Sequence, residues 1–264
     1  MLTWRRRLLS DTPITDLKSI ADAIQVLHKT YQVPHVIITS LRLTRDNQTI
    51  PSRPVSKAGT GTHTPSDSQQ PSLSQPKLDL SDVENLTIIG STATSDYKPR
   101  LFRIDTPQLP LFFSGTGDMF AALTVPRLIE AVHAASTPES DLHATPSWRS
   151  PDHVPAEQLP LAKACQKVLA SMQAILTRTT ASCQQKMEAY DARAAKQGRG
   201  EGDEADEEVA KRRHLALTNA SEVTVVRYVR ELLDPPELDR FKPKAVYEGG
   251  SVPREVRGEV ETVG

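Results

Sequence analysis

The stretch FFSGTGDMFAAL, residues 112–123, constrains the fold more than any other part of the sequence. Gly115 and Gly117 have no Cβ, so the backbone here can approach an anion and point successive N–H groups at it. The residues behind them have the composition of a helix, whose positive dipole end adds to that attraction. Asp118 falls at the start of this helix. The stretch predicts an anion-binding turn, or a structural strand-to-helix turn with Asp118 as its N-cap.

The residues around the glycines exclude three well-known motifs. A P-loop would continue with Gly-Lys-Ser/Thr, and a dinucleotide-binding fingerprint would carry a third glycine. A serine-hydrolase nucleophile would need Gly-x-Ser-x-Gly, whereas Ser114 precedes both glycines. The seven histidines show no metal-ligand spacing, so we predict no metal site from them.

The segment before residue 42 predicts a helix followed by a strand. Apolar residues recur at helical spacing over 16–31, and Thr15 and Asp16 offer an N-terminal cap. The β-branched run at 35–40 follows a proline and is typical of a buried strand. Together they predict one unit of an α/β fold.

More strands and helices are predicted on both sides of the glycine turn. Residues 85–92 and 98–105 predict two strands that form a hairpin around 95–96. An apolar face over 159–187 predicts one long helix, and residues 223–233 predict a shorter one.

Three polar segments have too few apolar residues to contribute to a core. They lie at about 45–82, 138–157 and 191–211, and we predict that they are disordered. The segment 242–264 is predicted to be a flexible tail. The sequence thus predicts one domain over 1–241, interrupted by polar inserts.

The overall charge disfavours a nucleic-acid or membrane partner. The chain of 264 residues carries 32 Lys+Arg and 33 Asp+Glu, so no strong field attracts such polyanions. No apolar run is long enough to cross a membrane. Cys165 and Cys183 are predicted to be reduced thiols, because about 27 Å would separate them along one helix. These features favour a cytosolic or nucleocytoplasmic protein.

Residues 112–123 resemble the ATP-site signature of fungal-type pyridoxal kinases in the ribokinase-like superfamily. In that family an aromatic pair, Gly-Thr-Gly-Asp and a Phe-Ala-Ala-Leu-type helix follow one another. Residues 35–40 resemble the family's strand whose final Thr-Ser lies near the nucleotide phosphates. The helix from 160 onward resembles the one on the adenine side, and 232–236 resemble part of the C-terminal helix.

The resemblance implies a ribokinase-like three-layer α/β/α fold, of which this chain carries the C-terminal nucleotide-binding part. It is expected to begin after the family's Asn-Gln-Phe-Glu-type segment and to lack the first strands of a doubly wound sheet. It also implies the site residues. Asp118 is the expected catalytic base, and the other implied residues contact the nucleotide: Gly115, Thr116 and Gly117 as the anion hole, Thr39 and Ser40 at the phosphates, and Leu109 and Phe113 at the adenine.

By the same resemblance, ATP with Mg²⁺ is the phosphoryl donor. The acceptor is the 5′-hydroxyl of pyridoxal, pyridoxine or pyridoxamine, and a homodimer is expected. Two alternatives stay open: a catalytically incomplete nucleotide-binding fragment, and another ribokinase-like enzyme such as a hydroxymethylpyrimidine kinase.

Overall fold

The computed structural model describes residues 10, 14, 16–41, 85–137, 141–196 and 203–246, with the side chains of 203–206 left aside. The predicted disordered segment at 45–82 lies outside the described residues, as does the tail beyond 246.

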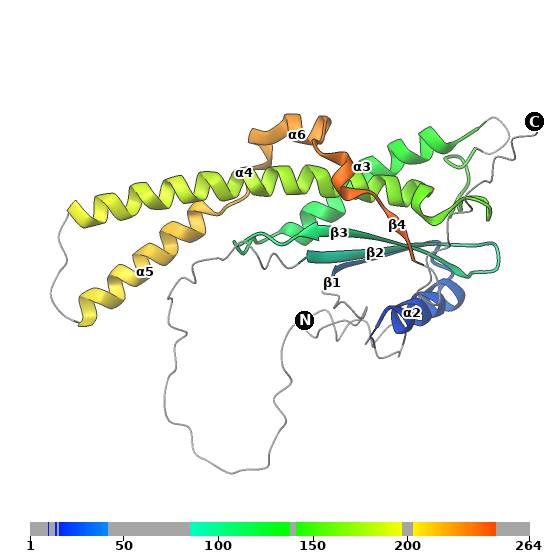
Figure 1. The fold of residues 1–264 in the computed structure, drawn as a ribbon, viewed down its shortest axis with the longest axis horizontal. Helices are drawn as coiled ribbons and strands as arrows, with labels where there is room; N and C mark the ends of the chain where they lie inside the picture. The colour runs from blue at the N-terminus through cyan, green and yellow to red at the C-terminus, as the bar shows by residue number, and fades with distance from the viewer. Residues whose placement is uncertain are drawn as a thin grey trace, which may run out of the picture.

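The described strands form one antiparallel sheet in the order β1-β2-β3-β4 (Figure 1). Its strands are β1 (His35–Leu41), β2 (Asn85–Ala93), β3 (Pro99–Pro107) and the two-residue β4 (Lys244–Ala245). The predicted hairpin is confirmed, since β2 and β3 pair along their whole length. Two expectations are corrected. The described strands are antiparallel rather than doubly wound, and β1 is half-buried rather than buried, because in the described sheet it is an edge strand.

Helices cover both faces of the sheet, so the predicted three-layer α/β/α arrangement is confirmed (Figure 1). On one face lies α2 (Leu17–Thr30), which packs Ile20 and Ile24 against Ile89 of β2. On the other lie α3 (Thr116–Ala135) and α4 (Pro160–Lys196), whose apolar side chains pack with Ile88 and Phe102. Adjacent strand residues alternate between these two clusters, as the pleat of a strand requires.

Helix α2 begins where its sequence predicts. Asp16 is the N-cap, and its carboxylate accepts a hydrogen bond of 2.7 Å from the backbone N–H of Ser19. The hydroxyl of Ser19 accepts one of 3.0 Å from the N–H of Asp16 in return. This reciprocal pair satisfies two backbone donors that a helix start leaves without partners.

The predicted disorder at 191–211 is wrong for the described part of that segment. Residues up to Lys196 continue α4, and α5 (Asp203–Ala220) begins soon afterwards. Cys183, Met187 and Ala220 form a small apolar cluster between the two helices. The guanidinium of Arg213 donates two hydrogen bonds of 3.0 Å to Asp191. A count of apolar residues missed this helical hairpin because ion pairs and few apolar contacts hold it.

The predicted disorder at 138–157 is also corrected, since residues 141–157 are described and include the 3₁₀ turn η2 (Ala156–Gln158). Arg100 of β3 anchors this loop. Its guanidinium donates to the carbonyl oxygens of Ser150 at 2.8 Å, Pro151 at 2.7 Å and Val154 at 3.3 Å. The anchor lies about fifty residues away in sequence, so the composition of the loop itself gives no sign of it.

Three short helical elements lie between α5 and β4: η3 (Val225–Tyr228), α6 (Val229–Leu233) and η4 (Leu238–Phe241). The helix predicted over 223–233 is therefore a 3₁₀ turn followed by a short α-helix. Within the predicted flexible tail, β4 pairs with β3, so residues 244–245 belong to the sheet. In the described part of the chain, no helix is both long enough and apolar enough to cross a membrane.

Candidate functional site

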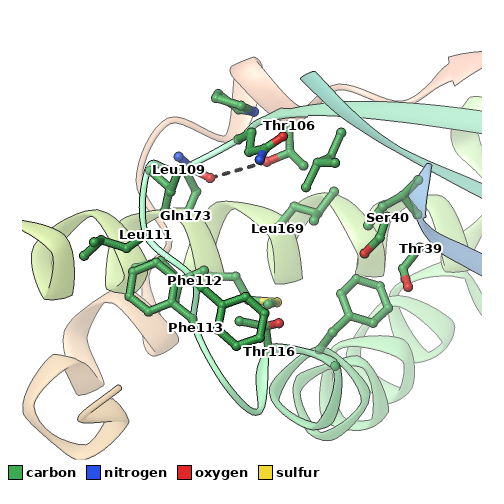
Figure 2. A pocket seen from close by; sticks show the side chains of 18 residues that line it. Thr39, Ser40, Thr106, Leu109, Leu111, Phe112, Phe113, Thr116, Leu169 and Gln173 are labelled. Atoms are coloured by element: carbon green, nitrogen blue, oxygen red, sulfur yellow. Dashed lines mark hydrogen bonds between the residues drawn. The ribbon is translucent and has the colours of Figure 1, made fainter. Parts of the chain in front are cut away.

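A pocket of about 300 Å³ opens where the end of β1, the end of β3, the loop before α3 and the middle of α4 meet (Figure 2). This is at the lower end of the range for small-molecule sites. The lining is largely apolar, with Leu169, Met172 and Leu176 supplied by α4. A few polar groups lie among these side chains, from Thr39, Ser40, Thr106, Gln108, Thr116 and Gln173.

Six of the seven residues expected to contact a nucleotide line this one pocket, although they come from two separate segments of the chain. They are Thr39, Ser40, Leu109, Phe113, Thr116 and Gly117. Gly115 does not line it, but its neighbour Thr116 does. Helical spacing and strand alternation could not have brought residues 39–40 next to residues 109–117, so their shared position follows from the fold.

An extra residue in β1 brings Thr39 and Ser40 together to the pocket. Ile38 pairs with Ile89 and Leu41 pairs with Thr87, so two residues of β1 lie opposite the single residue Ile88. Such a bulge interrupts the alternation of side chains. Ser40 adopts a left-handed backbone with φ +61°, which is uncommon for a residue with a Cβ. As a result, two consecutive hydroxyl side chains line the same cavity.

The start of α3 is arranged to receive an anion. Gly115 is the N-cap, in a left-handed conformation with φ +78° that glycine adopts without strain. It has no side chain with which to cap the helix, and the first helical hydrogen bond runs from the N–H of Met119 to the carbonyl of Gly115 at 2.9 Å. The N–H groups of the first turn therefore have no acceptor within the helix. They and the helix dipole favour a negatively charged group here.

Asp118 lies in the first turn of α3, one residue beyond Gly117, and is exposed. It does not line the pocket. The alternative interpretation of Asp118 as the N-cap is wrong, because Gly115 occupies that position. The carboxylate lies at the helix end that attracts anions and is free of the apolar cavity, so a second molecule could reach it from solvent.

Thr106, Phe112 and Gln173 are among the pocket residues to which the sequence analysis gave no role. Gln173 lies on the face of α4 that the pattern marked only as apolar. Its side-chain oxygen accepts a long hydrogen bond of 3.4 Å from the hydroxyl of Thr106, which is 67 residues away (Figure 2). Phe112 was noted only as half of an aromatic pair, yet it is 89% exposed and lines the pocket. Only the position of Phe112 beside the glycines could have suggested a role.

Within the described ranges, no three His, Cys, Asp or Glu side chains are grouped so that they could hold a metal ion. Magnesium in phosphoryl-transfer sites is commonly held by one or two carboxylates together with the substrate's phosphates.

No family model matches the chain, and no curated protein matches it. Among solved structures, it is similar to pyridoxal kinase from Leishmania donovani in complex with ADP, with 16% identity and a TM-score of 0.45 over 92% of this chain and 49% of that one. The complexes of that protein with ADP and pyridoxamine, and with ADP and pyridoxine, each give 16% identity and a TM-score of 0.42. The chain spans about half the length of these structures. A likeness at this level assigns no activity and no site residue.

Proposed function

We propose that this chain is the nucleotide-binding, catalytic-base part of a ribokinase-like small-molecule kinase. The observation that carries the proposal is the single pocket that six of the expected nucleotide residues share, next to the uncapped start of α3. An apolar cavity beside a helix N-terminus fits a ligand with a flat ring at one end and phosphates at the other. ATP is such a ligand.

In the proposed complex, the ring lies in the apolar part of the pocket, between Leu109, Phe113 and the side chains of α4. The phosphates lie toward the start of α3, where backbone N–H groups of residues 115–117 donate to them. The hydroxyls of Thr39 and Ser40 are a second source of hydrogen-bond donors to the phosphates. A loose phosphoryl-transfer transition state spreads charge over its oxygens, so donors fixed in this way stabilise it.

Asp118 is the proposed catalytic base. Its carboxylate accepts the proton of the acceptor hydroxyl as that oxygen forms its bond to the γ-phosphorus of ATP, and the bond to the β-phosphate oxygen breaks to release ADP. Mg²⁺ would neutralise phosphate charge in this reaction. Among the described residues, no three His, Cys, Asp or Glu side chains are grouped to hold a metal ion. We therefore propose no protein ligands for Mg²⁺, and no step above requires such ligands.

The proposed acceptor is the 5′-hydroxyl of pyridoxal, pyridoxine or pyridoxamine. This choice rests on the resemblance of residues 112–123 to pyridoxal kinases, and a hydroxymethylpyrimidine kinase would use the same residues. The exposure of Asp118 favours a second candidate, a chain that binds the nucleotide but has an incomplete acceptor site.

We also propose a single domain over 1–241, which limited proteolysis would test. A cytosolic or nuclear location would be tested by cell fractionation, and a homodimer by sedimentation.

The deciding experiment measures ADP release by the purified chain with ATP, Mg²⁺ and pyridoxal, alongside ATP binding by calorimetry. We expect pyridoxal-dependent release that falls at least about a hundredfold in Asp118→Asn, in the range of general-base catalysis, while ATP binding is retained. Asp96→Asn, an exposed aspartate in the β2–β3 turn, is the matched control. A folded chain that binds ATP without releasing ADP would select the incomplete candidate. A folded chain that binds no ATP would refute both.

A further inference from the structure

The pocket contains a pair of polar side chains that the proposed contacts with phosphate and ring do not use. Thr106, near the end of β3, and Gln173, on α4, meet across the cavity through their long hydrogen bond of 3.4 Å (Figure 2). Both side chains are half-buried. Leu109, Leu169 and Met172 line the same cavity, so the pair lies in largely apolar surroundings.

This pair retains hydrogen-bonding capacity toward a ligand. A carboxamide has two N–H donors and an acceptor oxygen with two lone pairs. One contact of 3.4 Å to Thr106 occupies a single lone pair and is longer than a strong O–H···O bond. A ring that enters the cavity displaces water from Gln173, so it must either replace those hydrogen bonds or leave the amide unpaired. The donors and acceptors along the edge of the ring that faces Gln173 should therefore determine which ring binds.

We propose that Gln173 is the specificity-determining residue for the nucleotide base and selects adenine over guanine. The inference rests on the proposed function, since it assumes that the pocket binds a nucleotide. Adenine presents an amino donor next to the N7 acceptor, and a carboxamide matches both at once. Guanine presents two acceptors, O6 and N7, at the same edge, so one of them would face the amide oxygen.

Thr106 is a positioning residue in this scheme. Its hydroxyl donates to the oxygen of Gln173, which limits rotation of the carboxamide and directs the NH₂ group away from Thr106. Phe112 strengthens the case for a planar ligand. Its side chain is 89% exposed at the pocket, and a stacked ring would cover it.

The test compares ATP and GTP binding by calorimetry with Mg²⁺, using the full chain. We expect the wild-type chain to bind ATP at least about tenfold more tightly than GTP, which is the effect of one well-placed hydrogen-bonding group. Gln173→Leu should weaken ATP binding about tenfold and reduce the ATP-to-GTP ratio to below about threefold. Thr106→Val, a change of similar shape, should lower the same ratio less. Gln185→Leu, at an exposed position on α4, is the matched control and should leave it unchanged.

The outcomes separate the two proposals. Equal affinity of the wild-type chain for ATP and GTP would overturn the role of Gln173, as would an unchanged ratio in a folded Gln173→Leu variant. Either result would leave the nucleotide-binding proposal standing. A wild-type chain that binds neither nucleotide would overturn both. If Gln173→Leu does not fold, the ratio in Thr106→Val decides.

Discussion

Gly90 of β2 lies directly opposite Phe102 of β3, and the aromatic ring covers the glycine. A Cβ at position 90 would lie 2.1 Å from the ring's Cζ and within 2.8 Å of two more ring atoms. Ordinary contacts begin at 3.4 Å, so the ring would have to move. It cannot move freely, because Phe102 is fully buried against Leu161, Cys165 and Leu169 of α4.

Gly90→Ala should therefore cost about 3 kcal/mol or more, at the upper end of what overpacking a core costs. That is a large fraction of the roughly 5–15 kcal/mol by which domains are stable. Urea unfolding followed by circular dichroism would measure it as a fall in the midpoint. Gly117→Ala is the matched control, because nothing lies within 4 Å of a Cβ placed there.

A double-mutant cycle shows whether the ring is the cause. Phe102→Leu removes the atoms that clash, so Gly90→Ala should cost far less in that background, with a coupling of about 2 kcal/mol. Additive effects, or a loss below about 0.5 kcal/mol for Gly90→Ala alone, would show that the ring does not restrict position 90.

Two further outcomes are expected. Burial lowers the pKa of His35 from 6.5 to about 4. As the pH falls through this range, the imidazole is protonated in the unfolded chain before it is protonated in the folded one. The free energy of unfolding should therefore fall by up to about 1.4 kcal/mol per pH unit. Urea unfolding at several pH values should show this slope flattened in His35→Gln and unchanged in His153→Gln, an exposed control. Burial also lowers the pKa of His28, so a smaller slope remains in His35→Gln; a slope as steep as that of the wild-type chain would exclude His35 as a source. Gly115→Ala should cost about 1–2 kcal/mol, because φ +78° is strained for a residue with a Cβ. Thermal unfolding would measure this, and a cost equal to that of Gly117→Ala would contradict it.

Local signals predicted the elements that depend on local physics. The cap at Asp16, the strand at 35–40 and the hairpin around 95–96 follow from short-range patterns, and each is found in the structure. The glycine turn was also recognisable, since the left-handed conformation at Gly115 is one that glycine supplies. Each of these features depends only on residues close in sequence, so a short stretch is enough to predict it.

The features that sequence reasoning missed depend on distant partners. Arg100 orders a loop about fifty residues away, and the contact between Thr106 and Gln173 spans 67 residues. Helix α5 was mistaken for disorder because its few apolar contacts become visible only when α4 is beside it. Composition within a window cannot register such partners, so it underestimates order wherever ion pairs or remote hydrogen bonds maintain it.

Because of the bulge in β1, the site depends on the number of residues in this strand. Side chains along a strand point alternately to the two faces of the sheet. The extra residue at 39–40 shifts this alternation by one, so Leu41 points to the face covered by α2 and packs in the apolar cluster there. Any two residues at positions 39 and 40 would keep Leu41 on that face, whatever their side chains. A shortening by one residue would restore strict alternation and send either the hydroxyl pair or Leu41 to the wrong side. At this point of the chain, length is therefore a more stringent requirement than residue identity.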